Sequence, residues 1–453
     1  MDYFNETQST FKNIFQRFKK RDFSGNTGQA MKNSSYQLAQ NLIIKISSFL
    51  FTIVVARLLM PELMGLYTLA LSTIIMFSIL SDFGIGSALF VFVAKLTSKG
   101  KDAEAKGYVK KLLKWKVYLL IFASVILLIL SYFVSEIFYQ KPIFYALLVG
   151  AIYLPILGFL EFLEIIFHAV GNFKHPLIKE IILQLLKLSF IPLAIFLLLK
   201  TTLSVKIIIA LIFCVLIFCS LITLLIFWIL AKKKISFLSI QAKDLNLKKV
   251  KGLKKFILPL TVTILSGIFF GYIDTIMLGR FVEAQFIAYY GVAFALISSA
   301  ISILSFASSP LFSTFSKLEG PVLEKMFKKS RNLISLISIS AGTLTYFLAY
   351  YIIKLAYGSA YLTAVPLLKW FALLIIILPI NSLYTTYFFV QKRTAIMAKI
   401  IILTTIINIV LNFLFISYGL RFGMFEAVLG VCFASIISRF VYFGCFVWFR
   451  KRE

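Results

Sequence analysis

The chain has few residues of the types that build soluble active sites. It has only two histidines, and it contains no Gly-rich phosphate loop with a lysine, no cysteine–histidine metal spacing and no nucleophile elbow. Its four cysteines all fall inside apolar segments: Cys214, Cys219, Cys432 and Cys445. We interpret them as small buried hydrophobes rather than disulfides or metal ligands. The sequence therefore predicts no enzyme activity, no metal site and no cofactor.

Charged residues are also scarce. They make up 14% of the chain, whereas 60% of residues are hydrophobic and the mean hydropathy is +0.95. This composition excludes a soluble fold in which each element has only one apolar face. Apolar runs long enough to cross a hydrocarbon core of ~30 Å, which takes about 20 helical residues, recur along the whole length. Because lipid cannot satisfy backbone polar groups, these runs predict an all-α polytopic membrane protein.

The apolar runs divide into twelve predicted transmembrane helices. The predicted spans are 37–59, 65–94, 115–136, 143–169, 178–199, 206–231, 256–281, 286–310, 332–355, 365–390, 398–417 and 425–449. The second is too long for one straight crossing. We expect Gly84 and Gly86 to mark a bend, followed by an extension along the membrane interface.

The lysines and arginines give the orientation. The net charge of +29 is concentrated in the loops after the second and sixth spans, whereas the opposite loops hold little more than Lys141, Lys200 and Arg421. By the positive-inside rule, the basic loops and both termini are cytoplasmic. The sequence thus predicts a multi-pass protein of the cell membrane. We expect its partner to be the lipid bilayer and not nucleic acid, despite the positive charge.

Four segments follow from this map. Residues 1–36 form a basic cytoplasmic or interfacial segment, 37–231 a first six-helix lobe, 232–255 a basic cytoplasmic linker, and 256–450 a second six-helix lobe. The first segment carries apolar residues at helical spacing, Phe11, Ile14, Phe15 and Phe18, beside lysines and arginines. This pattern fits an amphipathic helix on the membrane surface or a disordered basic tail.

The two halves carry a faint internal repeat with an offset of 223 residues. The stretch from Ala56 to Gly86 is echoed between Asp274 and Ser299, and Arg57 aligns with Arg280. Both arginines fall at the outer end of the first span of their half. Equal halves that both start in the cytoplasm are parallel repeats, which many transporters use.

Several polar residues lie inside the first-half spans. A charge at mid-membrane costs about 2.5 to 3.5 kcal/mol on insertion scales, so such residues are expected to be paired, hydrated or functional. Asn41 and Lys45 share a face of the first span. A hairpin of the fourth and fifth spans would pair three groups of residues, as structural neutralisation or as a hydrated proton path: His168 with Glu180, Glu164 with Gln184, and Glu161 with Lys187.

The second half holds fewer such residues. Asp274 has no charged partner within a helical turn in the sequence, and Arg439 has no nearby acid, so we expect Arg439 to face a cavity. Asn408 and Asn412 lie one turn apart and could equally be hydrogen-bonding glue between helices.

Three stretches of the chain are similar to a known family. They are SSYQLAQNLIIKISSFLFTIVVARLLMPELMGLYTLALSTIIMFSILSDFGIGSAL near the amino terminus, LTVTILSGIFFGYIDTIMLGRF at the start of the second half, and NIVLNFLFISYGLRFGMFEAVLGVCFASI near the end. With these the chain resembles the polysaccharide-exporter branch of the multidrug/oligosaccharidyl-lipid/polysaccharide flippase superfamily. The resemblance runs over most of the chain and is most specific in the first stretch.

The resemblance implies a twelve-helix flippase that works by alternating access between two lobes. Its substrate would be a polyprenyl-diphosphate-linked oligosaccharide, moved from the cytoplasmic to the outer leaflet. It would act as a monomer, coupled to H⁺ or Na⁺. The candidate substrate-binding residues are Lys45, Lys187, Arg439, Asn41, Asn408 and Asn412. The candidate ion-coupling acids are Glu161, Glu164 and Asp274, and Arg57 and Arg280 are candidate outer gate residues.

Two alternatives remain open at this point. A multidrug or cation antiporter of the same superfamily would need an acidic cavity, and the balance of intramembrane lysines, arginines and acids does not decide between the two. A membrane-embedded glycan polymerase or ligase would usually need a sizeable outer loop, and every predicted outer loop is short.

Overall fold

The computed structural model describes residues 25–451 except 244, 307–310, 312–314 and 316–317. Every element in this part of the chain is helical, and no strand occurs there. The elements are α2 (Gly25–Ser78), η1 (Ile79–Ser81), α3 (Ile85–Thr97), α4 (Asp102–Tyr132), η2 (Phe133–Tyr139), α5 (Phe144–Ala169), α6 (Lys174–Leu198), α7 (Val205–Lys234), η3 (Ser236–Ser239), α8 (Leu247–Phe281), α9 (Ala284–Phe306), α11 (Gly320–Tyr357), η4 (Ser359–Ala364), α12 (Val365–Val390), α13 (Thr394–Gly419) and α14 (Met424–Lys451).

The helices are long and apolar enough for a multi-pass membrane protein. Within the described residues, ten helices could each cross a bilayer by length and composition. One of them, α2, covers the first predicted span and the first part of the second, because it bends at Met60 instead of ending (φ 56°, ψ 171°). The bend falls there because Pro61 follows, and the residue before a proline is excluded from helical backbone angles.

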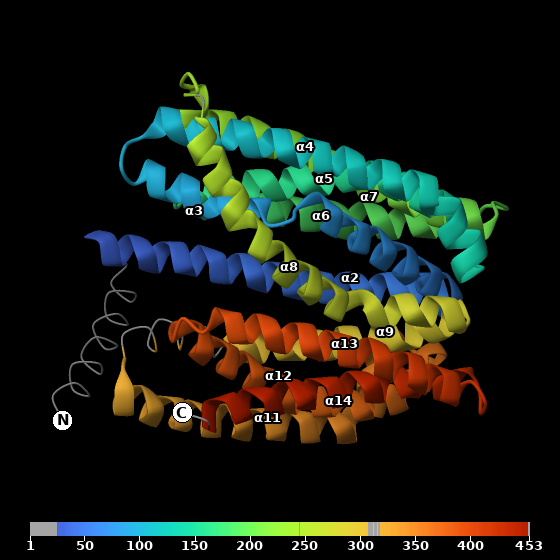
Figure 1. Cartoon of the computed structure of the whole chain (residues 1–453). Coiled ribbons are helices and arrows are strands. Elements are labelled where there is room, and N and C mark those ends of the chain that lie inside the picture. Colours follow the sequence, from blue (N-terminus) through green and yellow to red (C-terminus); the bar gives the residue numbers. More distant parts are fainter. Residues whose placement is uncertain (1–24, 244, 307–310, 312–314, 316–317, 452–453) are drawn as a thin grey trace.

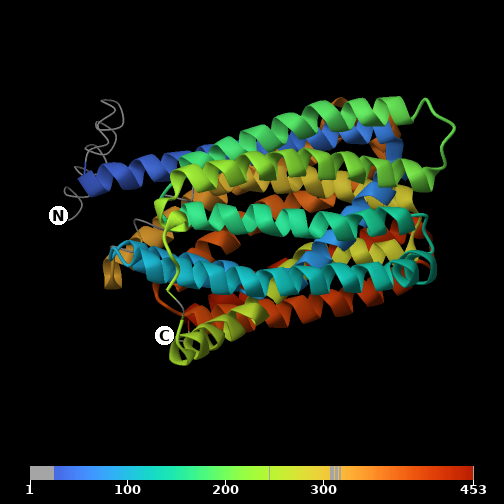
Figure 2. The same ribbon diagram turned by 90° about the horizontal axis from the view of Figure 1, so that it is seen from above.

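The helices run nearly parallel in two bundles (Figures 1 and 2). In Figure 1, α3 to α7 lie above α2, whereas α9 and α11 to α14 lie below it, and α8 crosses from the upper group to the lower one. The start of α2 and the end of α14 lie at the same end of the molecule. One apolar core fills the first-half bundle around Phe167 and Phe227. A second fills the corner around Phe327 and Tyr384, and a third joins the two halves.

Several helices begin earlier than their predicted spans. The first helix starts at Gly25 instead of 37, α4 at Asp102 instead of 115, and α11 at Gly320 instead of 332. Hydropathy marks only the part of a helix that lipid surrounds, whereas the helix itself continues into polar sequence. Many of the lysines assigned to the loop after the second span therefore lie on the first turns of α4.

The segment between α7 and α8 packs against the first bundle. The Lys243 backbone N–H donates to the carbonyl oxygen of Ala103 at 2.9 Å. Lys249 forms an ion pair with Glu104 at 2.5 Å. A Cβ at Gly107 would lie 2.1 Å from the Lys243 carbonyl oxygen, so only glycine permits this approach. The segment predicted to be a linker is thus fixed to the start of α4.

Two further expectations can be compared with the structure. The amphipathic pattern of Phe11 to Phe18 lies outside the described residues. All four cysteines are free thiols, and Cys219 and Cys432 are buried as predicted. The expected burial is wrong for Cys214, which is exposed on α7, because a lipid-facing position needs only an apolar side chain.

Candidate functional site

The second predicted span is broken in its middle, and the break carries the first polar cluster. After η1, Phe83 (φ 41°) and Gly84 (φ 87°) take left-handed backbone angles that end one helix before α3 begins. The Asp82 carboxylate then accepts hydrogen bonds from the backbone N–H groups of Gly84 and Gly86, both at 3.2 Å. This caps α3 with a negative charge at its positive end. The predicted bend at Gly84 is confirmed, but it lies between two packed helices.

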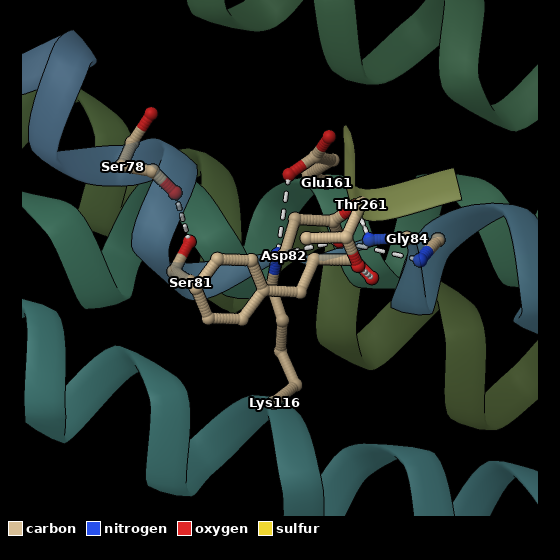
Figure 3. Close-up of polar contacts among 9 residues, drawn as sticks. Ser78, Ser81, Asp82, Gly84, Lys116, Glu161 and Thr261 are labelled. Carbon is tan, nitrogen blue, oxygen red and sulfur yellow. Dashed lines mark hydrogen bonds and ion pairs between the residues drawn. The ribbon is translucent and has the colours of Figure 1, made fainter. Parts of the chain in front are cut away.

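Lys116 of α4 completes this cluster (Figure 3). Its ammonium lies 3.1 Å from Asp82 Oδ1 and 3.4 Å from Glu161 Oε2. The Lys116 side chain is 1% exposed, whereas the Glu161 side chain is 58% exposed. The cluster therefore joins a buried cation to one carboxylate whose side chain is exposed. On the opposite side, the Thr261 hydroxyl of α8 donates to the Phe83 carbonyl oxygen at 2.8 Å.

A second cluster lies beside it around Lys179 of α6. The Lys179 ammonium contacts Glu164 at 2.7 Å and Glu180 at 2.9 Å. Gln184 donates to Glu180 at 2.7 Å, and Gln40 of α2 donates to Glu164 at 2.6 Å. Together the two clusters hold four carboxylates and two lysines, so with every group ionised they carry a net negative charge.

These contacts correct the expected ladder between the fourth and fifth spans. Glu164 and Glu180 share Lys179 instead of pairing with Gln184 and His168, and Glu161 pairs with Lys116 instead of Lys187. The ladder is wrong because α6 packs mainly against α2 and α7 rather than along α5. The His168 ring stacks on Phe173, with ring centroids 4.8 Å apart.

The third cluster lies in the second half around Asp274 of α8. Its buried carboxylate accepts hydrogen bonds from Tyr290 of α9 at 2.7 Å, from Asn412 of α13 at 2.6 Å, and from Ser435 of α14. Asn412 also donates to Asn408 at 3.4 Å. Four helices therefore converge on one carboxylate, and these three hydrogen-bond donors are neutral.

Arg439 lies one helical turn beyond Ser435 and is within electrostatic reach of Asp274. The structure thus brings four predicted site residues together: Asp274, Asn408, Asn412 and Arg439. The other two predicted cations lie in the first half. Lys45 is exposed on α2, as is Asn41. Lys187 lies over the Phe51 ring at 5.0 Å.

The two arginines of the repeat make reciprocal contacts at the far end of the molecule from the chain termini. Arg57 of α2 donates to the carbonyl oxygens of Leu355 and Ala356, the latter at 2.7 Å, at the end of α11. Arg280 of α8 donates to the carbonyl oxygen of Phe138, at 2.8 Å, at the end of η2. Each arginine therefore satisfies the unpaired carbonyls at a helix end in the other half of the chain.

A close helix contact accompanies these arginines. A Cβ at Gly65 of α2 would lie 1.7 Å from the Ala284 carbonyl oxygen at the start of α9, so the two backbones touch. Tyr361 donates to the Ala56 carbonyl oxygen at 2.9 Å. Lys141 donates to the Gly279 carbonyl oxygen at 2.6 Å. We call this set of contacts between the halves the outer seal, after the outer position that the sequence predicts for Arg57 and Arg280.

Sequence reasoning missed Asp82, Lys116 and Lys179 as site residues. An Asp followed by glycines at the second and fourth positions, inside an apolar run, is a signal for a capped helix break. Lys116 and Lys179 follow basic segments, so they resemble ordinary cytoplasmic charges in sequence. Only the tertiary structure places them among carboxylates.

Solved structures share this fold. An inward-facing conformation of a multidrug resistance MATE family transporter of the MOP superfamily is 13% identical, with a TM-score of 0.66 over 92% of this chain and 97% of that chain. The lipid II flippase MurJ, in an inward closed conformation, is 17% identical, with a TM-score of 0.64 over 91% of this chain and 86% of that chain. An outward-facing conformation of a MATE family transporter is 13% identical and has a TM-score of 0.53, over 95% of this chain and 96% of that chain. The chain therefore has the fold that these solved structures share.

A comparison of the sequence with family models assigns the chain to one family. The family model "Polysaccharide biosynthesis protein" matches residues 30–319, which is more than half of the chain. The chain therefore belongs to the polysaccharide biosynthesis protein family of flippases, as its resemblance in sequence predicts. No curated protein matches the chain by sequence.

Proposed function

We propose that this protein moves a polyprenyl-diphosphate-linked oligosaccharide or polysaccharide repeat unit from the cytoplasmic to the outer leaflet of the cell membrane. The family match to polysaccharide biosynthesis supports a glycan substrate. The similar fold of a lipid II flippase supports a lipid-linked one. In this proposal both termini are cytoplasmic, the linker is 232–255, and lobes 37–231 and 256–450 rock against each other about a central site.

The outer seal is the observation that carries the proposal. Arg57 and Arg280 fasten opposite halves together at one end of the molecule, where the backbones of Gly65 and Ala284 touch. With the proposed orientation, this state is closed to the outside and takes up substrate from the cytoplasm. The higher TM-score against an inward-facing transporter than against an outward-facing one supports the same assignment. Arg57 and Arg280 are thus proposed as outer gate residues.

The buried carboxylates support ion coupling. Asp274 receives hydrogen bonds from Tyr290, Asn412 and Ser435, so its carboxylate is held in place near Arg439. Glu161 and Glu164 belong to clusters in which carboxylates outnumber lysines. We propose Asp274 as the principal coupling acid, with Glu161 and Glu164 in a connected first-half path.

The cationic residues support an anionic head group. Lys45 is exposed on α2, and Arg439 lies beside the Asp274 cluster. A diphosphate needs positive charge in a hydrated site, while its lipid tail stays in the bilayer. We propose Lys45, Lys187 and Arg439 as diphosphate ligands, with Asn41, Asn408 and Asn412 as polar neighbours.

Reconstitution tests this function. Proteoliposomes are loaded with a polyprenyl-diphosphate oligosaccharide in one leaflet, and its arrival in the other leaflet is followed by a membrane-impermeant probe of the sugar. We expect transport by the wild type, and slower transport by Arg439→Ala and by Lys45→Ala, each recovered as folded protein. Lys325→Ala, an exposed lysine outside the proposed site, is the control and should transport normally.

A multidrug or cation antiporter is the second candidate, and one observation favours it. The two first-half clusters carry four carboxylates and two lysines, which suits a cationic substrate. The same vesicles should therefore be tested with cationic drugs. Drug efflux without movement of the lipid-linked sugar would replace the first proposal with this one.

A further inference from the structure

A basic pocket lies at the end of the second-half bundle, apart from the three clusters described above. It has a volume of about 520 Å³ and lies between the start of α11 and the ends of α12 and α14. Among the described residues that line it, four are cations and one is a carboxylate: Lys328, Arg331, Arg393, Arg450 and Glu324. The pocket therefore presents an excess of positive charge.

The single lining carboxylate is already engaged. Glu324 forms an ion pair with Arg450 at 2.5 Å and accepts a hydrogen bond from Tyr387. Arg450 is also held over the Phe327 ring, at 4.2 Å from its centroid. These contacts fix one wall of the pocket in a single arrangement. Lys328 and Arg331 lie one helical turn apart on the same face of α11 as Glu324 and supply charge beyond what Glu324 neutralises.

The first half has an equivalent corner with the opposite character. In that half, the third, fourth and sixth membrane helices are α4, α5 and α7. The start of α4 meets the ends of α5 and α7 there, as the start of α11 meets the ends of α12 and α14 in the second half. Apolar side chains fill that corner, and Phe167 stacks on Phe227 with centroids 4.9 Å apart. The segment after α7 covers it, with Phe237 only 3% exposed. The second-half corner is thus not an inevitable result of the repeat, and its basic lining calls for a ligand of its own.

The position of the pocket indicates the class of ligand. It lies at helix ends, where the hydrocarbon core gives way to head groups. On the same helix, α11 then exposes large apolar side chains such as Leu333 (58%) and Leu336 (65%). A lipid could therefore place its phosphate in the pocket and its chains along α11. Arginine binds phosphate through paired N–H groups, and basic pockets between membrane helices suit anionic head groups.

We propose that this basic pocket binds the phosphate group of an anionic lipid in the cytoplasmic leaflet. The pocket is separate from the proposed transport site, and the inference rests on the proposed orientation but not on transport. The phosphate could belong to a bilayer phospholipid or to a polyprenyl diphosphate. These two sources share the chemistry that the pocket recognises, and they can be separated by experiment.

Lipid binding to the purified full-length protein is the test, with native mass spectrometry as the readout. The lipids are phosphatidylglycerol, polyprenyl diphosphate and the neutral phosphatidylcholine, each titrated separately. The variant is Lys328→Gln/Arg331→Gln. The control is Lys325→Gln, which removes a lysine one turn earlier on the same helix and outside the pocket lining. Thermal unfolding of each protein confirms that it is folded.

We expect the double variant to lose affinity for the anionic lipid by about tenfold, because it lacks two charge-assisted contacts to phosphate. The control should bind as the wild type does. Preferential binding of phosphatidylglycerol would assign the pocket to the surrounding leaflet, and preferential binding of polyprenyl diphosphate would assign it to substrate capture. Equal binding of phosphatidylcholine, or unchanged anionic lipid binding by the double variant, would overturn the proposal. Neither result would contradict the proposed transport function, which the vesicle assay tests separately.

Discussion

At the scale of single residues, Lys116 is a lysine buried inside an apolar helix. Taking an ammonium out of water costs several kcal/mol, and its pairing with Asp82 and Glu161 offsets this cost. The arrangement is sensitive to change because each member of the cluster compensates the others. Removing the cation leaves two carboxylates near each other without a counter-charge, and Asp82 is only 20% exposed.

We therefore predict that Lys116→Met destabilises the protein by about 3 to 5 kcal/mol, the usual effect of breaking a buried ion pair. Thermal unfolding in detergent measures this. Adding Asp82→Asn should restore part of the loss, since asparagine can still accept the N–H groups of α3 without the charge. Lys114→Met, at an exposed position of the same helix, is the control. Equal unfolding temperatures for Lys116→Met and the wild type would contradict the prediction.

Asp274 is the corresponding residue of the second half. Asp274→Asn keeps a hydrogen-bonding side chain among Tyr290, Asn412 and Ser435 but removes the charge. We expect the variant to fold and to lose the dependence of transport on pH or sodium. Transport rates in vesicles across a range of pH and Na⁺ concentrations measure this. A dependence like that of the wild type would remove Asp274 from the coupling mechanism.

At the scale of elements, breaks in helices and turns between them position the polar groups. The break between α2 and α3 exposes backbone N–H groups inside the bundle, and Asp82 satisfies them. The turn between η2 and α5 similarly brings Lys141 to the end of α8, where it donates to the Gly279 carbonyl oxygen. Residues in short irregular segments therefore make polar contacts with neighbouring helices.

Lys141 gives this turn a pH dependence. Burial first, and then the charge of Arg280, lower the pKa of Lys141 from 10.5 to about 8, although Glu283 opposes this shift. Between these pH values the unfolded chain binds more protons than the folded protein, so stability rises with pH. At pH 7 the folded protein must keep an unfavourable charge there.

We predict that Lys141→Gln is more stable than the wild type at pH 7 and that this advantage shrinks as the pH rises from 8 to 10. Thermal unfolding at several pH values measures the difference. Lys200→Gln, at an exposed position of the next loop on the same side, should differ from the wild type by a constant amount. A constant difference for Lys141→Gln as well would show that its charge does not affect stability.

At the scale of the whole molecule, the outer seal joins the two halves at one end, and in the proposed orientation it closes the outer side of the transporter. The contacts of Arg57 and Arg280 are reciprocal, because each half caps a helix of the other. Alternating access requires both sets of contacts to break when the outer side opens. The close approach of Gly65 to Ala284 adds a steric condition to the closed state.

Gly65→Ala should therefore shift the protein toward an outward-open state. The new methyl group would lie 1.7 Å from the Ala284 carbonyl oxygen, so the helices must separate. Spin labels at the exposed outer positions Glu62 and Glu283 report the separation as a longer distance between them. Gly291→Ala is the control, because its methyl group would lie 3.4 Å from Thr68, an ordinary contact. Equal distances in the two variants would show that the Gly65 contact does not limit opening.

The sequence by itself determined the class of fold. Long apolar runs have to become helices in lipid, and the structure confirms an all-helical membrane protein over the described residues. Resemblance in sequence also identified the superfamily. Individual polar positions such as Asp274, Asn412 and Arg439 stood out because any charge or amide in a span is expensive. These conclusions depend on composition and local pattern, which the chain carries without folding.

Only the tertiary structure decided which groups meet. Helical spacing predicted pairs between the fourth and fifth spans. Helix packing instead pairs Glu164 with Lys179 and Glu161 with Lys116. It also brought Arg57 and Arg280 onto carbonyls from distant helices. Such contacts follow from the packing of twelve predicted spans, which depends on the shape of every side chain at once. Periodicity along one helix shows which residues share a face but not which helix that face will meet.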